Sequence, residues 1–151
     1  MAENARFFFS ISRKSLQKRA VRFLHSARDM ETPPYEIQER TFQFACRIVR
    51  FCRQLSDAHP VTRKLAFELL KSGTSVGANT EEADAGQTKP DFRTKIAVAR
   101  KEAKESVYWL RLIAATDARW SQHTPSLLEE ANQLASILTA IKKKAGENDD
   151  R

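Results

Sequence analysis

The chain has 151 residues, of which 41% are hydrophobic and 30% charged, and its formal net charge is +7. This length suits one domain with a sizeable core. No run of about 18 apolar residues occurs, so we expect no membrane-spanning helix. Ala, Leu, Glu, Lys and Arg are frequent while Gly and Pro are scarce, and this composition favours an all-α fold.

Most of the positive charge lies in residues 1–30, where seven Arg and Lys residues accompany two acidic ones. That segment carries +5, which leaves +2 for residues 31–151, so the charge is poor evidence for a polyanion-binding domain. We expect residues 1–33 to form a basic extension. Three interpretations stay open: a mobile extension, a start codon placed too early, with Met30 as the alternative, or a basic arm for a partner. The Arg- and Ser-rich composition is also typical of an organellar transit peptide.

Apolar residues recur at helical intervals in four segments after residue 33. The first helix is predicted over residues 35–55. Pro60 suits the first turn of a second helix, which should end near residue 85, before Gly86. Cys46 and Cys52 lie on different faces of the first helix and cannot pair with each other there, which predicts two reduced packing cysteines in a cytoplasmic protein.

The second helix contains an unusual stretch with two glycines, Gly73 and Gly77, among Ser, Thr and Asn. Each glycine inside a helix costs about 1 kcal/mol relative to alanine. The flanking composition nevertheless predicts one unbroken helix, whose core seam consists of Leu65, Leu69, Ser72, Val76, Asn79 and Ala83. The small residues Ala66, Gly73, Gly77 and Thr80 form the adjacent face. We therefore expect a neighbouring helix to approach this face closely.

A third helix is predicted from an N-cap at Thr88, with Asp91 completing an approximate capping box, to about Asp117. Its apolar positions alternate in steps of four and three residues, which is a heptad seam. The seam consists of Phe92, Ile96, Ala99, Ala103, Ser106, Leu110 and Ile113.

The connection that follows is expected to be polar and irregular as far as residue 123. A fourth helix should open after Thr124, with Ser126 and Glu129 as its capping pair, and end at Gly146. Its predicted seam consists of Leu127, Ala131, Leu134, Leu138 and Ile141. Four long helices with short connections predict an antiparallel up-down-up-down four-helix bundle over residues 34–146, followed by a frayed acidic end at 147–151.

Polar residues on the second and third helices form a candidate interface. Ser75, Asn79 and Glu82 share a face of the second helix, and Glu105 on the third can approach them if the two helices are antiparallel. Lys71 is a candidate hydrogen-bond donor to this group. Because buried polar groups must be satisfied, we predict that the group fixes the register between helices or subunits.

Cationic residues form stripes along two helices. The interpretation as a solvated face and the interpretation as a nucleic-acid-binding surface that tracks phosphates both stay open. The candidate nucleic-acid-binding residues are Lys89, Arg93, Arg100, Lys104 and Arg111 on the third helix and Arg40, Arg47 and Arg50 on the first.

Catalytic and metal-binding patterns are missing from the sequence. No Glu-x-x-His pair occurs, and His25, His59 and His123 fall in the N-terminal segment and the predicted loops. We therefore expect no enzymatic activity, no metal, no cofactor and no small-molecule substrate.

The chain resembles the four-helix bundle proteins of the ribosomal RNA intervening-sequence type, and the accessory proteins of diversity-generating retroelements are similar. The pattern Ser-x-x-x-Asn-x-x-Glu, formed by Ser75, Asn79 and Glu82, carries this resemblance together with Glu105. Where the family pattern has Gln and Arg, this chain has Glu68 and Lys71. The other matching stretches are residues 35–42, 68–79, 82–83, 91–92, 101–106 and 109–110.

The resemblance implies an antiparallel four-helix bundle that assembles as a ring-like homopentamer without enzymatic activity. It implies RNA or DNA, or a reverse transcriptase, as candidate partners besides the chain itself. We therefore predict an oligomeric bundle that binds nucleic acid or a nucleic-acid enzyme through a basic surface. The alternative is a purely structural or protein-interaction scaffold without nucleic-acid binding.

Overall fold

The computed structural model describes residues 34–147, and residues 1–33 and 148–151 lie outside it. Four long helices and two short ones make up the described part, which contains no strand. In chain order these are α2 (Pro34–Gln54), η1 (Leu55–Asp57), α3 (Pro60–Asp84), α4 (Lys89–Thr116), α5 (Ala118–Ser121) and α6 (Pro125–Glu147). The predictions for the N-terminal segment and for the acidic end after Glu147 fall on residues that are not described.

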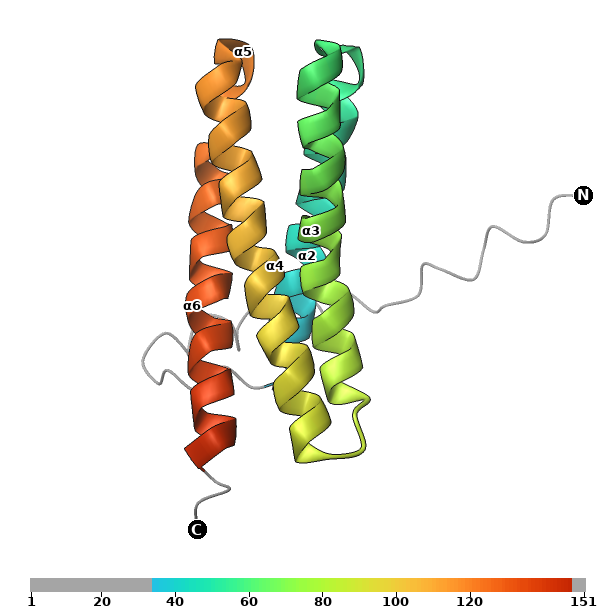
Figure 1. Cartoon of the computed structure of the whole chain (residues 1–151), viewed down its shortest axis with the longest axis vertical. Coiled ribbons are helices and arrows are strands. Elements are labelled where there is room, and N and C mark those ends of the chain that lie inside the picture. The colour runs from blue at the N-terminus through green and yellow to red at the C-terminus, as the bar shows by residue number, and fades with distance from the viewer. Residues whose placement is uncertain (1–33, 148–151) are drawn as a thin grey trace, which may run out of the picture. The chain divides into compact units, whose positions relative to one another are not determined.

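Consecutive long helices run in opposite directions (Figure 1). The α4 helix packs against α3 on one side and against α6 on the other, and α2 packs against α3. Contact between α2 and α6 is much less extensive. The prediction of an all-α bundle of four long helices is confirmed.

The predicted seams form the core. On α4, all seam residues are buried except Phe92, which is half-buried, and on α6 only Ile141 is half-buried. The α2 helix contributes its own buried apolar row, whose members are Ile37, Phe44, Ile48 and Phe51, with Leu55 following in η1. The helical spacing in the sequence therefore identifies the faces that remove apolar area from water.

The α3 helix runs unbroken through both glycines, and these face α2. A Cβ atom on Gly73 would lie 2.8 Å from Cγ1 and Cγ2 of Ile48, and one on Gly77 would lie 3.4 Å from the carbonyl oxygen of Thr41. The α2 helix therefore comes close to α3 along this face, with side-chain atoms opposite Gly73 and backbone atoms opposite Gly77.

The starts of α3, α4 and α6 follow the sequence, which placed them at Pro60 and just after Thr88 and Thr124. The Thr88 side chain accepts a hydrogen bond from the backbone N–H of Asp91, as predicted, and the His59 side chain accepts one from the N–H of Val61 before Pro60 opens α3. The predicted capping pair Ser126 and Glu129 is wrong, because α6 already begins at Pro125.

The α6 helix opens after Thr124, as predicted, but its end differs from the prediction. The backbone N–H of Leu128 donates to the carbonyl of Thr124, which places Thr124 just before the helix. Gly146 does not end α6, because the helix includes it and continues to Glu147. A glycine needs no left-handed conformation to remain helical, and none of the described glycines has a positive φ.

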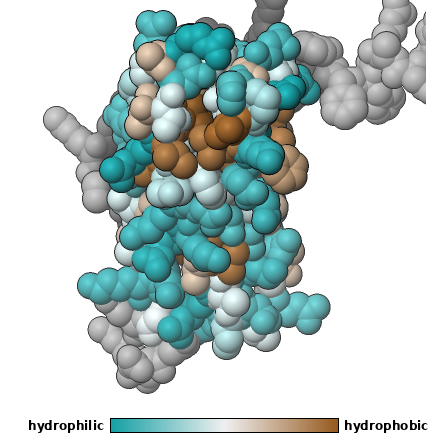
Figure 2. All heavy atoms as spheres, turned by 45° about the horizontal axis from the view of Figure 1, so that its top comes forward, coloured by the Kyte–Doolittle hydropathy of each residue, from teal (hydrophilic) through white to brown (hydrophobic). Residues whose placement is uncertain are grey.

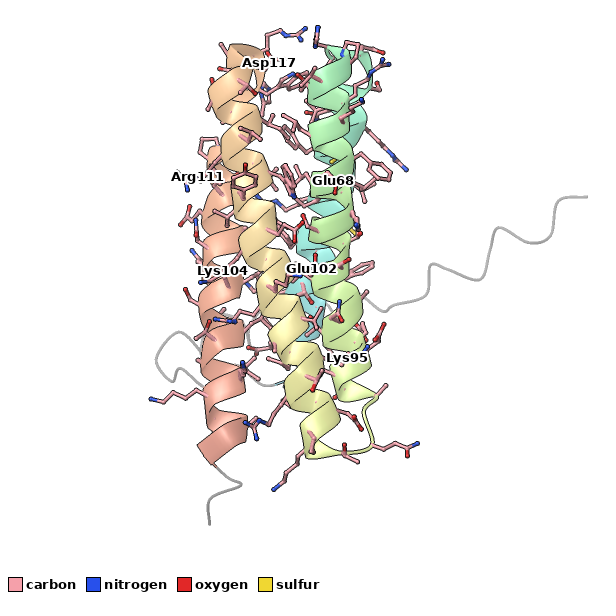
Figure 3. All side chains as sticks on the ribbon, viewed as in Figure 1. Glu68, Lys95, Glu102, Lys104, Arg111 and Asp117 are labelled. Atoms are coloured by element: carbon pink, nitrogen blue, oxygen red, sulfur yellow. The ribbon has the colours of Figure 1, made fainter. Side chains whose placement is uncertain are left out.

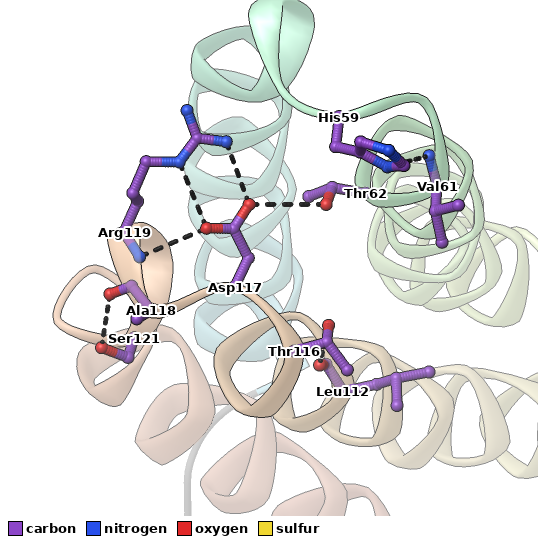
Figure 4. Close-up of polar contacts among 9 residues, drawn as sticks. All are labelled: His59, Val61, Thr62, Leu112, Thr116, Asp117, Ala118, Arg119 and Ser121. Atoms are coloured by element: carbon purple, nitrogen blue, oxygen red, sulfur yellow. Dashed lines mark hydrogen bonds and ion pairs between the residues drawn. The ribbon is translucent and has the colours of Figure 1, made fainter.

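The expected irregular connection after α4 is wrong as well, because it contains α5. Asp117 is the C-cap of α4 and also the N-cap of α5. Its side chain accepts a hydrogen bond from the backbone N–H of Arg119 in the first turn of α5 (Figure 4). The guanidinium of Arg119 and the hydroxyl of Thr62 on α3 donate to the same carboxylate. Hydrogen bonds from Arg119 hold the pKa of Asp117 below its ordinary value, although partial burial acts in the opposite direction. Trp120 then packs edge-on against Phe51, with ring centroids 6.2 Å apart.

Candidate functional site

The α4 helix carries different chemistry on its two edges. Figure 3 shows Glu102 on the edge that faces α3, and Lys104 and Arg111 on the side toward α6. We call the first the polar α3/α4 edge, formed by Lys71, Ser75, Asn79, Glu82, Glu102 and Glu105. We call the second the basic α4 face, formed by Arg93, Arg100, Lys104 and Arg111.

The predicted register residues lie on the polar α3/α4 edge, but much of their bonding stays local. The side-chain amide of Asn79 donates to the carbonyl of Ser75 on its own helix at 2.8 Å. Glu82 forms an ion pair with Lys95 of α4. The carboxylate of Glu105 accepts a hydrogen bond of 3.4 Å from the indole N–H of Trp109, one turn along the same helix.

The buried polar contact between α3 and α4 is made by two serines that the sequence placed in separate seams. The hydroxyl of Ser106 donates to that of Ser72 at 3.1 Å, and both side chains are at most 1% exposed. Both hydroxyls also lie within hydrogen-bonding distance of a carbonyl of their own helix. Their positions at seam sites of adjacent helices were the signal that could have predicted the pair.

On the polar α3/α4 edge, the surroundings of Glu102 clearly shift its pKa. Burial raises the pKa of its carboxyl above the ordinary 4.5, and the nearby Glu105 raises it further. Lys101 and Lys71 act in the opposite direction but do not cancel the increase. The predicted donor Lys71 is on α3, and its charge interacts with the carboxylate of Glu102 on α4.

Replacing Glu102 by glutamine is therefore expected to raise the melting temperature near neutral pH. The raised pKa means that the folded state favours the protonated carboxyl, and this contribution to stability is lost as the pH rises through the folded-state pKa. The gain from the Gln side chain should shrink as the pH falls through the folded-state pKa and should be lost below the ordinary value of 4.5. Thermal melts across this range test it, with Glu81→Gln as a matched change at an exposed site. Equal gains from both variants would contradict the account.

Residues of the basic α4 face lie along the junction with α6. Lys104 lines a shallow groove together with Asn132, Ala135 and Ser136 of α6. Arg100 is half-buried, and its Nε is buried without a hydrogen-bond partner. The guanidinium of Arg93 lies 3.3 Å from the position of a Cβ on Gly146. Lys89 is exposed at the start of the helix.

The candidate arginines of α2 are differently placed, because two of them bond to α6. Arg40 forms a two-pronged ion pair with Glu130, with Nε to Oε1 at 2.6 Å and Nη2 to Oε2 at 3.2 Å, and it also donates to Gln133. Arg47 donates to the hydroxyl of Ser126 at 3.1 Å. These contacts join α2 to α6, two helices that otherwise make few contacts. The third candidate arginine of α2, Arg50, is exposed.

The cysteines are both free, and Cys52 packs between α2 and α3. Its thiol donates to the carbonyl of Ala66 at 3.3 Å, and burial raises the pKa of the thiol to about 12. A thiol with so high a pKa supplies almost no thiolate at neutral pH, so Cys52 is poorly suited to nucleophilic or metal chemistry.

Two further findings apply to the part of the chain that the structure describes. No group of three or more His, Cys, Asp or Glu side chains there is arranged to hold a metal ion. None of its helices combines the length and the apolar character needed to cross a membrane.

Comparison with known proteins gives a consistent result. Residues 34–140 match the family described as 23S rRNA-intervening sequence protein. The chain is 30% identical to a protein of unknown function from the S23 ribosomal protein family of Bacteroides thetaiotaomicron, whose crystal structure superposes with a TM-score of 0.67. That comparison covers 74% of this chain and 99% of the other. No curated protein matches. The described bundle spans the whole matched region, and the chain therefore belongs to the 23S rRNA-intervening sequence protein family.

Proposed function

We propose that this protein is a non-enzymatic homo-oligomer, a ring-like homopentamer, that binds RNA through the basic α4 face. The family description refers to an insert in ribosomal RNA, and the sequence resemblance implies both the ring and a nucleic-acid partner. The proposal assigns the polar α3/α4 edge to contacts between helices and subunits and the basic α4 face to phosphates.

The separation of charge across α4 is the observation that carries this proposal. Lys104 and Arg111 are exposed on the side toward α6, and neither forms an ion pair with a carboxylate within residues 36–146. The acidic residues Glu102 and Glu105 lie toward α3 instead. The two cations are separated by about 10 Å along the helix axis, so two phosphates of one strand can be contacted without an opposing carboxylate.

Repetition in an oligomer makes such a small surface sufficient. Each phosphate that a cation neutralises releases counterions, so the affinity depends steeply on salt. Copies held in one assembly engage the same strand at high effective concentration. A surface that binds weakly in one copy can therefore bind usefully in a ring.

Fluorescence anisotropy with a labelled single-stranded RNA over a range of salt concentrations tests the proposal. Lys104→Glu/Arg111→Glu should weaken binding at least about ten-fold and lower the slope of log affinity against log salt by about one for each phosphate that the variant no longer neutralises. Arg111→Glu alone should weaken binding more than Arg53→Glu, which changes the same charge at an exposed site on α2. Equal and small losses in those two variants would show that only net charge matters.

The scaffold without nucleic-acid binding is the second candidate function. The bonding of Arg40 and Arg47 to α6 favours it, because these side chains already have partners within the bundle. It predicts that the wild-type protein does not retain RNA at physiological salt. Under that outcome the basic α4 face is a solvated surface.

A further inference from the structure

An apolar hollow lies at the end of the bundle where α3 begins. Its volume is about 470 Å³, and its walls include Pro60 and Leu65 of α3 and Trp109 of α4. Phe67 stands on its rim and is 65% exposed. The face of the molecule drawn in Figure 2 carries a group of apolar side chains that is surrounded by hydrophilic ones. Phe67 is off the α3 seam, so the bundle itself gains little from an aromatic residue there.

Two of the three charged residues that line the hollow have a spacing that is complementary to itself. Lys64 and Glu68 lie one turn apart on either side of Phe67 in the sequence, and the third charged residue is Arg63. No ion pair joins Lys64 to Glu68 within α3. If a second α3 packs antiparallel against this one, the Lys64 of each copy lies opposite the Glu68 of the other, and each Phe67 ring lies next to the other copy's hollow.

We propose that a second copy of this chain docks on this hollow through an isologous, two-fold contact between α3 helices. The two-fold axis crosses the contact midway between the levels of Lys64 and Glu68 along α3, so two Lys64–Glu68 pairs flank the paired Phe67 rings. Contact between identical surfaces differs from the contact in a ring, which joins two different surfaces. The proposed contact therefore adds to the proposed ring: it doubles the assembly, whatever the number of subunits is, and it does not use the basic α4 face.

The native mass of the full-length protein tests the contact. Phe67→Asp should have half the native mass of the wild type at the same protein concentration, because an aspartate would be buried beside the apolar hollow. Helical content should stay unchanged, since Phe67 is largely exposed in the single chain. Phe42→Asp is the matched control, because Phe42 is 56% exposed on α2 outside the hollow, and its mass should equal that of the wild type.

Charge reversal tests the antiparallel register. Lys64→Glu and Glu68→Lys should each raise the dissociation constant of the doubled assembly at least about ten-fold, because like charges then face each other. The combined Lys64→Glu/Glu68→Lys variant restores opposite charges and should recover the wild-type mass. The proposal is overturned if Phe67→Asp keeps the wild-type mass, if Phe42→Asp halves it too, or if the combined variant stays as weak as the single ones. RNA binding by Phe67→Asp should persist, so this proposal and the RNA proposal can fail separately.

Discussion

Replacing Gly73 by alanine is expected to lower the free energy of unfolding by up to about 2 kcal/mol. The added Cβ would lie 2.8 Å from two carbons of Ile48, a side chain that is completely buried and cannot move away freely. Overpacking of this kind costs about 1–3 kcal/mol, which exceeds the gain of about 1 kcal/mol from replacing glycine inside a helix. Chemical denaturation of the wild type and the variant measures the difference.

Gly77→Ala is the matched control on the same face of α3. Its Cβ would lie 3.4 Å from the carbonyl oxygen of Thr41, which is an ordinary contact distance. We therefore expect no loss, and a gain of up to about 1 kcal/mol from helix propensity. If Gly73→Ala were as stable as Gly77→Ala, α2 would not pack against α3 as closely as the structure indicates.

Leu110→Ala is expected to destabilise the protein most, by about 2–5 kcal/mol, because it removes a completely buried side chain and leaves a cavity. Tyr108, two residues away on the same helix, is 55% exposed. Tyr108→Ala should change the free energy of unfolding by only about 0.5 kcal/mol. Denaturant titration of both variants compares the two faces of α4.

Similar losses at positions 108 and 110 would place the core on a different face of α4 and would displace the basic α4 face with it. The comparison therefore checks the orientation of the helix on which the functional proposal depends. A loss confined to Leu110→Ala leaves the cations where Figure 3 shows them.

The long helices could be predicted from the sequence because burial repeats with the period of the helix. Seven seam positions of α4 and five of α6 recur in steps of three and four residues, and hydrophobic burial acts in the same direction on all of them except the polar Ser106. Even the two glycines of α3 could be placed inside a helix, since the residues on both sides favour one. Local pattern and tertiary packing agree throughout these segments.

Short structures that depend on tertiary contacts could not be predicted in the same way. The α5 helix has only four residues, too few for a periodic signal, and it depends on the Asp117 cap and on packing of Trp120 against Phe51. The capping pair of α6 was predicted wrongly, because Ser126 and Glu129 fit a capping pattern although the helix already begins at Pro125, which suits its first turn.

The candidate sites were the least predictable part, because side-chain partners depend on which helices are neighbours. The sequence grouped Arg40 and Arg47 with the cations of α4, but their partners are on α6, about 80 to 90 residues away in the chain. The exposure of Phe67 likewise could not be predicted, because the hollow that it lines is formed by α3 together with Trp109 of α4. A charge stripe in a sequence therefore gives the number of cations but not which of them are already bonded.

Native mass spectrometry of the full-length protein mixed with a short single-stranded RNA tests the central claim most directly. The account predicts an assembly of several chains that retains RNA, and loss of that RNA without loss of the assembly in Lys104→Glu/Arg111→Glu. A protein that stays monomeric and retains no RNA would contradict it.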